Sequence, residues 1–315
     1  MRALRWDGAR LALARDLPDP VPDAGDALIA VHLAGICRTD VEITRGYLGF
    51  RGTPGHEWVG SVLTAPDPAL VGARVVGEIN FACHACSACA AGLERHCPTR
   101  RVMGIVGADG AFAERVVVPA ATLHRVPDAV DDQVAVFTEP LAAAFEVLEQ
   151  LGDVAGRRAV VLGDGKLGLL VAQVLGAAGA SVVLAGRHDP KLARARALGV
   201  ATGTPAPGAD VVVDATGAPG GLAAALALVR PRGTIVLKTT VAALHQVDLA
   251  PAVVNEVTVL GSRCGPFGPA LAALAGGRVA VAPLIDAVYP LDQGVAALAR
   301  AATPGTFKVL LDARA

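Results

Sequence analysis

Apolar residues over positions 1–131 come in short runs that glycine and proline interrupt. The clearest runs are ALIAVHLAGI at 27–36, WVGSVL at 58–63, ARVVGEI at 73–79 and FAERVVV at 112–118. Short β-like runs between turn residues predict the strands of a compact β domain. A mixed pattern returns from residue 266 and ends in TFKVLLDA at 306–313.

The periodicity changes at residue 131. Residues 131–151 have helical spacing, acidic residues near the start and Gly152 after the end, which predicts a helix. Five strands are then expected at 158–163, 181–186, 209–217, 233–239 and 256–262, and helices at 167–179 and 190–199. This alternation predicts βαβ units and a parallel sheet covered on both faces. We therefore expect an α/β chain in which a β domain (1–131 and 266–315) is interrupted by a nucleotide-binding domain (132–265).

The composition of the chain limits the classes of molecule that it is expected to bind. The 315 residues suffice for two domains, 53% of them are hydrophobic, and the formal net charge is -1. Such a balance predicts no general attraction to nucleic acid or anionic membranes, and aromatics at 3% provide few stacking platforms for bases. The opening residues MRALRWDGAR lack an apolar leader, and no long apolar run predicts a membrane span. We expect a cytoplasmic protein that acts on a small molecule.

A glycine motif follows the strand expected at 158–163. It matches G-x-G-x-x-G and consists of Gly163, Asp164, Gly165, Lys166, Leu167 and Gly168. The motif alone is weak and also fits an ordinary strand–helix turn. Here it follows an apolar strand and opens an apolar helix, so its glycines allow a tight turn and close approach to a pyrophosphate. The helix N-terminus then offers free N–H groups to that anion.

The end of the next strand predicts which dinucleotide is bound. An acid at this point would hydrogen-bond the ribose hydroxyls of NAD. The sequence has Gly186 there, followed by Arg187 and His188. Without the acid a 2′-phosphate is not repelled, and an arginine can bind it bidentately. We expect NADP(H) to be preferred over NAD(H); the alternative is that Asp189 replaces the acid.

Four cysteines lie close together at 83–97, in the stretch CHACSACAAGLERHC. They are Cys83, Cys86, Cys89 and Cys97. Four thiolates in a short loop are typical of a closed, structural zinc site. An iron–sulfur cluster is the alternative, but its usual last gap is shorter than the seven residues here. Disulfides are disfavoured in a large chain without a secretory leader.

Two further segments carry potential metal ligands. GICRTDVE contains Cys37, Thr39 and Asp40, and PGHEWVG contains His56 and Glu57. Taken singly, a cysteine after a strand is usually a core residue and a histidine in a turn is usually solvated. Their co-occurrence with the cysteine cluster and the βαβ pattern suggests a second, open metal site.

Together these motifs resemble the zinc-dependent medium-chain dehydrogenase/reductase superfamily, which includes alcohol and polyol dehydrogenases. The resemblance covers essentially the whole chain. It rests on G-I-C-x-T-D, G-H-E-x-x-G, the four-cysteine lobe, G-D-G-K-L-G, and V-V-D-A-T-G at 212–217. It implies a GroES-like β domain, a Rossmann domain, an active site in the cleft between them, and a homodimer or homotetramer.

The resemblance also implies a catalytic zinc site. Cys37 and His56 match two of its ligands, and Asp40 matches a residue that orients the ligating histidine. The alcohol dehydrogenase branch has a third ligand, a cysteine, near residue 139, but this chain has Glu139 in an E-P-L triplet typical of the polyol branch. Glu57 and Glu139 are therefore both candidate ligands. Glu139 can alternatively stabilise a helix N-terminus ahead of a proline.

Three more positions take roles from the resemblance. Thr39 matches the hydroxyl that hydrogen-bonds an alkoxide and begins a proton relay, whereas the relay histidine of some relatives is replaced by Glu42. Thr216, in V-V-D-A-T-G, matches a cofactor-binding position. Lys308 matches a basic residue that contacts the cofactor phosphate; the alternative is an ordinary solvated lysine.

The expected function is a zinc-dependent oxidoreductase with one catalytic and one structural zinc. It would transfer a hydride between NADP(H) and an alcohol, polyol or sugar-type hydroxyl, or the matching aldehyde or ketone. Two alternatives remain: an NADPH-binding redox sensor without turnover, and a zinc-independent reductase of the same superfamily.

Overall fold

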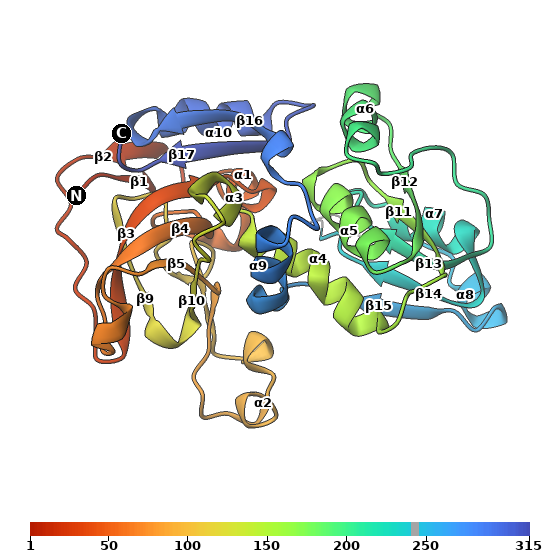
Figure 1. Cartoon of the computed structure of the whole chain (residues 1–315), viewed down its shortest axis with the longest axis horizontal. Coiled ribbons are helices and arrows are strands. Elements are labelled where there is room, and N and C mark those ends of the chain that lie inside the picture. Colours follow the sequence, from red (N-terminus) through yellow and green to blue (C-terminus); the bar gives the residue numbers. More distant parts are fainter. Residues whose placement is uncertain (241–245) are drawn as a thin grey trace. The chain divides into compact units, whose positions relative to one another are not determined.

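The computed structural model describes residues 1–240 and 246–315 (Figure 1). The chain divides into two compact units, one of Met1–Glu139 with Val281–Ala315 and one of Pro140–Ala280. Both divisions lie on the C-terminal side of the boundaries expected after residues 131 and 265. The first division falls inside the helix α4 (Thr138–Leu151), so this helix begins in the first unit and continues in the second.

A seven-stranded sheet forms the framework of the first unit. Its order is β10-β5-β4-β3-β17-β16, and β9 also pairs with β3. The strands are β3 (Asp26–Gly35), β4 (Glu57–Thr64), β5 (Arg74–Gly77), β9 (Arg115–Pro119), β10 (Leu123–Arg125), β16 (Ile285–Pro290) and β17 (Lys308–Asp312). β16 and β17 pair in parallel, and the other neighbours pair antiparallel. The end of the chain is thus hydrogen-bonded to a strand near its beginning.

β3 shows how the sequence pattern builds this sheet. Ile29, Val31 and Leu33 alternate with less buried residues and point into the core, because successive side chains of a strand face opposite sides. The strand ends at Gly35, and the next residues enter the helix α1 (Arg38–Ile43). The strand expected at 27–36 is confirmed to within a residue at each end.

Smaller elements complete the first unit. They are β1 (Ala3–Trp6) and β2 (Leu11–Ala14), which form a hairpin; β6 (Asn80–Phe81), β7 (Arg101–Met103) and β8 (Gly107–Ala108), which form a small sheet; and the helices α2 (Ser87–Ala90), α3 (Asp132–Ala135) and α10 (Gly294–Ala302). α2 lies in the cysteine-rich loop, which projects from the sheet of its unit (Figure 1).

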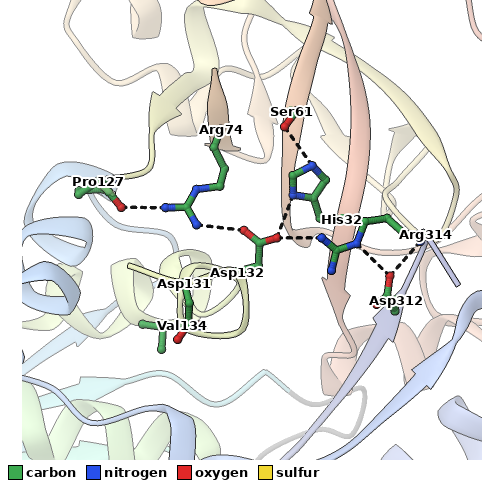
Figure 2. Close-up of polar contacts among 9 residues, drawn as sticks. All are labelled: His32, Ser61, Arg74, Pro127, Asp131, Asp132, Val134, Asp312 and Arg314. Atoms are coloured by element: carbon green, nitrogen blue, oxygen red, sulfur yellow. Dashed lines mark hydrogen bonds and ion pairs between the residues drawn. The ribbon is translucent and has the colours of Figure 1, made fainter. Parts of the chain in front are cut away.

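A polar network around Asp132 joins five segments of the first unit (Figure 2). Its carboxylate accepts hydrogen bonds from His32 Nδ1 at 2.9 Å, Arg74 Nη1 at 3.2 Å and Arg314 Nη1 at 3.3 Å. The other ring nitrogen of His32 lies 3.0 Å from Ser61 Oγ. These contacts connect β3, β4, β5, α3 and the C-terminal residues, so one carboxylate holds together parts of the chain that are far apart in sequence.

The second unit contains a five-stranded parallel sheet in the order β12-β11-β13-β14-β15. The strands are β11 (Arg158–Leu162), β12 (Ser181–Ala185), β13 (Ala209–Asp214), β14 (Val229–Leu237) and β15 (Thr258–Gly261). The remaining helices are α5 (Lys166–Ala177), α6 (Asp189–Ala197), α7 (Gly221–Leu228), α8 (Ala250–Val254) and α9 (Phe267–Ala275). The expected α/β class, with a GroES-like β domain and a Rossmann-type parallel sheet, is confirmed.

The strand order of the second unit defines a binding edge. The chain passes from β11 to β12 on one side and then to β13 on the other, so the order reverses at β11. In open parallel sheets, ligands bind outside the carboxyl ends of the strands at this switch point. The loops after β11 and β13 touch there: a Cβ on Gly163, whose φ is +114°, would lie 2.4 Å from the Ala215 carbonyl oxygen. Only glycine suits this position.

Candidate active site

Asp40 organises the turn between β3 and α1 in the first unit. Cys37 is the N-cap of α1, and its backbone N–H donates a hydrogen bond of 2.7 Å to Asp40 Oδ2. This is the reciprocal arrangement of a capping box, with aspartate at the third helical position. Asp40 is fully buried, and its other oxygen accepts a hydrogen bond of 3.2 Å from the Gly55 N–H. One carboxylate therefore connects the two candidate ligand segments.

The same carboxylate faces the ring of His56. His56 Nδ1 lies 3.2 Å from Asp40 Oδ1, and the ring is almost entirely buried. Burial opposes protonation of the ring, but the charges of Asp40 and Cys37 prevail and hold the pKa of His56 well above its usual value. With Nδ1 directed at a carboxylate, Nε2 is the nitrogen left to bind a metal, as in many metal-ligating histidines.

Three ligand atoms converge beside Asp40. One each from Cys37, His56 and Glu57, they lie within 4.8 Å of one another. A thiolate, an imidazole and a carboxylate are all zinc ligands, and three protein ligands leave a fourth position open for water or substrate. The residues therefore fit a catalytic zinc ion. Glu139, in the first turn of α4, is not a member of this group, and its ligand role stays a prediction.

Thr39 lies beside the candidate site, as the resemblance implied. The Cys37 thiol is 3.8 Å from the Thr39 hydroxyl oxygen, and both side chains are half-buried. Glu42, which replaces the relay histidine, instead forms ion pairs with Arg38 at 2.7 Å and Arg45 at 3.0 Å. These pairs are partly exposed to solvent. Thr39 is thus adjacent to a candidate metal ligand, Glu42 is engaged with arginines, and the relay role of Thr39 stays a prediction.

Lys308 occupies a position that the sequence pattern did not indicate. Its ammonium forms an ion pair with Glu57 Oε2, and neither side chain is exposed. The ammonium also lies 5.4 Å from the centre of the Phe137 ring. Burial lowers the pKa of Lys308 to about 8, against the opposing charges of Cys37 and Asp40. Lys308 is therefore not an ordinary solvated lysine: its partner is a candidate metal ligand, and the expected contact with a cofactor phosphate stays a prediction.

The neighbouring strand leaves room for this pair. A Cβ on Gly35 would lie 2.6 Å from Lys308 Nζ and 2.8 Å from Glu57 Oε2. Gly35 pairs with Glu57 of β4 on one side and with Leu310 of β17 on the other. This three-strand register cannot be read from local periodicity, which explains why the pairing of Lys308 with Glu57 was not predicted.

The four cysteines of the projecting loop also converge. Their sulfurs lie within 4.8 Å of one another, with 3.5 Å between Cys86 and Cys89 and between Cys83 and Cys97. All six cysteines of the chain are free thiols. A hydrogen bond from the Ala85 backbone is the largest factor that lowers the pKa of Cys83 to about 6, whereas burial raises that of Cys89 to about 12. Four sulfurs so placed fit a closed tetrahedral zinc site.

The second unit presents the glycine motif as expected. Gly165 is the N-cap of α5, and a Cβ on Gly168 would lie 2.0 Å from the Gly163 carbonyl oxygen. The free N–H groups at the start of α5, which begins with Lys166 and Leu167, can bind an anion such as a pyrophosphate. The predicted cofactor contacts of these residues stay predictions.

Thr216 lies in the adjoining loop after β13. Its hydroxyl donates a hydrogen bond of 2.7 Å to Asp214, and the Thr239 hydroxyl donates one of 3.0 Å to the same oxygen. The Thr239 oxygen in turn accepts a 3.0 Å bond from the Gly217 N–H. The buried Asp214 therefore braces the loop that touches the glycine motif, and Thr216 is held at the binding edge.

β12 ends where the cofactor specificity was predicted. Gly186, Arg187 and His188 are exposed, and Asp189 is the first residue of α6. Asp164, inside the glycine motif, accepts hydrogen bonds from this segment that were not predicted from the sequence.

Among the described residues, no helix is long and apolar enough to cross a membrane.

Two family models match the chain. The alcohol dehydrogenase GroES-like domain matches residues 23–128, and the zinc-binding dehydrogenase model matches residues 167–275. The first range contains all four cysteines of the lobe together with Cys37, His56 and Glu57, and the second contains the segment after β12.

Known proteins are similar over almost the whole length of the chain. A 2-dehydro-3-deoxy-L-galactonate 5-dehydrogenase from Pseudoalteromonas atlantica is 31% identical over 93% of both chains. A crystal structure described as a zinc-binding dehydrogenase from Sinorhizobium meliloti, bound to NADP, is 29% identical with a TM-score of 0.91, covering 99% of this chain and 98% of the other. An alcohol dehydrogenase from Escherichia coli CFT073, complexed with NADH, is 28% identical with a TM-score of 0.91 over 99% of both chains.

Proposed function

Because the chain belongs to the zinc-dependent medium-chain dehydrogenase/reductase superfamily, we propose that it is a zinc-dependent, NADP(H)-linked alcohol or polyol dehydrogenase. The substrate would be an alcohol, polyol or sugar-type hydroxyl, or in the reverse direction the matching ketone or aldehyde. The observation that carries the proposal is the convergence of Cys37, His56 and Glu57 on one point beside the buried Asp40.

In this proposal each residue has a defined task. Cys37 and His56 hold the metal with Glu57, and Glu139 remains a candidate for the same shell. Zinc bound there supplies a Lewis acid that polarises the substrate oxygen. Asp40 holds both the Cys37 backbone and the His56 ring in place. The Thr39 hydroxyl, whose oxygen lies next to the Cys37 thiol, would accept the substrate's hydroxyl proton while it passes its own proton on to the next acceptor of a relay.

Lys308 controls the charge of the site in this scheme. Its ammonium compensates the negative charge of the buried Glu57. The carboxylate can therefore stay ionised and available as a ligand. A thiolate and a carboxylate together balance the charge of a divalent cation, and the ammonium limits the excess negative charge when no metal is bound.

The preference for NADP(H) rests on the end of β12. Gly186 provides no carboxylate for ribose hydroxyls, and Arg187 presents an exposed guanidinium beside it. The Sinorhizobium meliloti structure holds NADP and the Escherichia coli structure holds NADH, so the superfamily uses both. The residues of this chain favour the phosphorylated cofactor.

The substrate class follows from the relatives and the open ligand position. The Pseudoalteromonas atlantica relative is named for a polyhydroxylated acid, and other relatives are named as sorbitol and D-altritol dehydrogenases. We propose a polyhydroxylated substrate with a secondary hydroxyl, which a panel of polyols and sugar acids can identify.

We also propose self-association through the second unit. β15 is an edge strand of its sheet, and Val259 on it is 41% exposed. The nearby helix α8 exposes Val253 and Val254 by 76% and 79%. An apolar sheet edge of this kind is commonly covered by another chain. A dimer or tetramer would be detected by light scattering.

The deciding experiment combines metal analysis with a cofactor-matched substrate screen. Protein purified without chelators should contain two zinc ions per chain, and polyols should reduce NADP⁺ faster than NAD⁺. Arg187→Asp should reverse that preference. One zinc per chain and no turnover with any alcohol would contradict the proposal, and would favour a role in binding NADPH without catalysis.

A further inference from the structure

Asp164 occupies the space that Gly186 leaves at the end of β12. A Cβ on Gly186 would lie 2.3 Å from Asp164 Oδ2, so the aspartate excludes any larger residue there. Asp164 itself sits in the turn between β11 and α5, within the glycine motif. The carboxylate at this strand end thus comes from the neighbouring turn and not from β12.

The carboxylate is already engaged with the Arg187–His188 segment. Asp164 Oδ2 accepts hydrogen bonds from the backbone N–H of Arg187 at 2.6 Å and of His188 at 2.8 Å. His188 Nδ1 lies 3.0 Å from both carboxylate oxygens. Burial raises the pKa of Asp164, but the hydrogen bonds from His188 and the backbone outweigh it and leave that pKa below its usual value. Asp164 is therefore a charged acceptor.

These contacts leave little of the carboxylate for a ligand. Asp164 is only 7% exposed, and Oδ2 already accepts two backbone hydrogen bonds. An acid that selects NAD must instead offer its oxygens to the ribose hydroxyls. The Asp164 carboxylate is therefore better suited to hold the Arg187–His188 segment in place than to accept hydrogen bonds from a ribose.

Two side chains extend outward from this segment: the Arg187 guanidinium is a donor, and Nε2 of His188 donates only when the ring is protonated at both nitrogens. A carboxylate only accepts, so His188 Nδ1 carries a proton, and Nε2 lies on the opposite side of a ring that is 48% exposed. The Arg187 guanidinium is exposed and makes no ion pair within the part of the chain that the structure describes. Two nitrogen-bearing side chains thus extend from a backbone that Asp164 fixes.

We propose that Asp164 is a positioning residue for cofactor selection, which holds Arg187 and His188 so that both bind the 2′-phosphate of NADP(H). The inference rests on the proposed function, and extends it from the residues that would contact the phosphate to the acid that places them. Asp164 does not touch the phosphate. It keeps the proton on His188 Nδ1 and stabilises a positive charge on the ring when the anion binds at Nε2.

The test is Asp164→Asn in the full chain loaded with zinc. Its asparagine can accept the backbone hydrogen bonds through one oxygen, but it cannot stabilise a positively charged His188. Dissociation constants for NADPH and NADH are measured separately by the fluorescence of the bound cofactor, without turnover. We expect NADPH binding to weaken roughly tenfold more than NADH binding, because hydrogen bonds between charged groups are worth more than neutral ones.

Two further variants isolate the mechanism. Asp189→Asn removes an exposed carboxylate at the start of α6 and should leave the ratio of the two constants unchanged. His188→Gln keeps a side-chain N–H donor but cannot become positively charged, and should weaken NADPH binding alone. In a double-mutant cycle, Asp164→Asn and His188→Gln together should cost NADPH binding less than the sum of the single effects.

The outcomes separate the inference from the proposed function. Equal losses for both cofactors would mean that Asp164 only maintains the fold, and a relative gain for NADPH would mean that it acts as a ribose acceptor; either overturns the inference. If Asp164→Asn does not fold, His188→Gln decides, since unchanged NADPH binding would also overturn it. A wild-type protein that prefers NADH would refute the proposed cofactor preference, while the shift caused by Asp164→Asn would still report on its role.

Discussion

Lys308 and Glu57 form an ion pair in which both side chains are fully buried. A buried charge that loses its partner is costly, by about 3–5 kcal/mol, because no solvent replaces the lost contact. Lys308→Met should therefore lower the free energy of unfolding by about that amount. Equilibrium denaturation of the zinc-free proteins in urea measures it, because Glu57 is also a candidate zinc ligand.

The control for this prediction is the double variant Glu57→Gln with Lys308→Met, which removes both charges. It should recover most of the stability that Lys308→Met loses. A single variant as stable as the wild type would show that the pair does not hold the charges as the structure indicates.

Replacing Gly35 by a larger residue should also destabilise the protein, because a side chain there would collide with the buried ion pair. Gly35→Ala would bring a methyl group to 2.6 Å from Lys308 Nζ, and overpacking of this kind costs about 1–3 kcal/mol. Gly176→Ala, in the helix α5 with no atom within 4 Å of the new methyl group, should be neutral or stabilising. Thermal melting of the two variants compares them directly, and equal melting temperatures would argue against close packing at Gly35.

Because of Asp132, the free energy of unfolding should decrease as the pH falls in the acidic range. A hydrogen bond from His32 is the largest cause that lowers the pKa of Asp132 below its model-peptide value of 3.8. A carboxylate with a lowered pKa in the folded state stabilises the protein above its unfolded pKa, and this contribution is lost as the pH falls through the folded pKa.

The matching variant is Asp132→Asn. It should be less stable than the wild type by about 1 kcal/mol at neutral pH, after allowance for partial solvent screening. The difference should disappear as the pH falls below 3.8. Urea denaturation across that range would contradict the prediction if the difference stayed constant.

The cysteine lobe should bind metal independently of the active site. Cys89→Ser should remove one zinc per chain and lower the melting temperature, because a structural metal contributes its binding energy to folding. Cys264→Ser, outside both clusters, should keep both metals. Metal analysis by mass spectrometry, with melting curves, would reject the structural role if Cys89→Ser kept its zinc.

Cys37→Ser should separate chemistry from cofactor binding. It removes a soft ligand from the open site, so turnover and one zinc should be lost. NADPH binding should persist, since the glycine motif lies in the other compact unit. Persistent turnover at the wild-type rate would refute a catalytic metal at Cys37.

The regular elements were predictable because their signals are local. The strand at 27–36 and the alternation from β11 to β15 follow from periodicity, and the glycine motif from its place between an apolar strand and an apolar helix. The fold class follows from that order. These features depend on residues within a few positions of one another.

The remaining features depend on contacts between distant segments. The ion pair between Lys308 and Glu57 was not predicted, because the pairing of β17 with β3 that brings the two residues together leaves no trace in the local sequence. Asp164 was overlooked because the usual rule examines the end of β12, whereas the acid enters from the turn after β11. Glu139 stays a candidate ligand, since its role depends on a metal shell that sequence order cannot define.

The position of β17 also affects how the protein is made. A ribosome releases β3 and β4 early, whereas the strand that separates β3 from β16 emerges after the whole second unit. The continuous stretch Pro140–Ala280 can fold while translation proceeds, but Glu57 must wait for its counter-ion until the final strand leaves the exit tunnel. Completion of the metal-binding unit is therefore a late event of biosynthesis, and a nascent chain stalled before residue 308 should expose its unfinished sheet to chaperones.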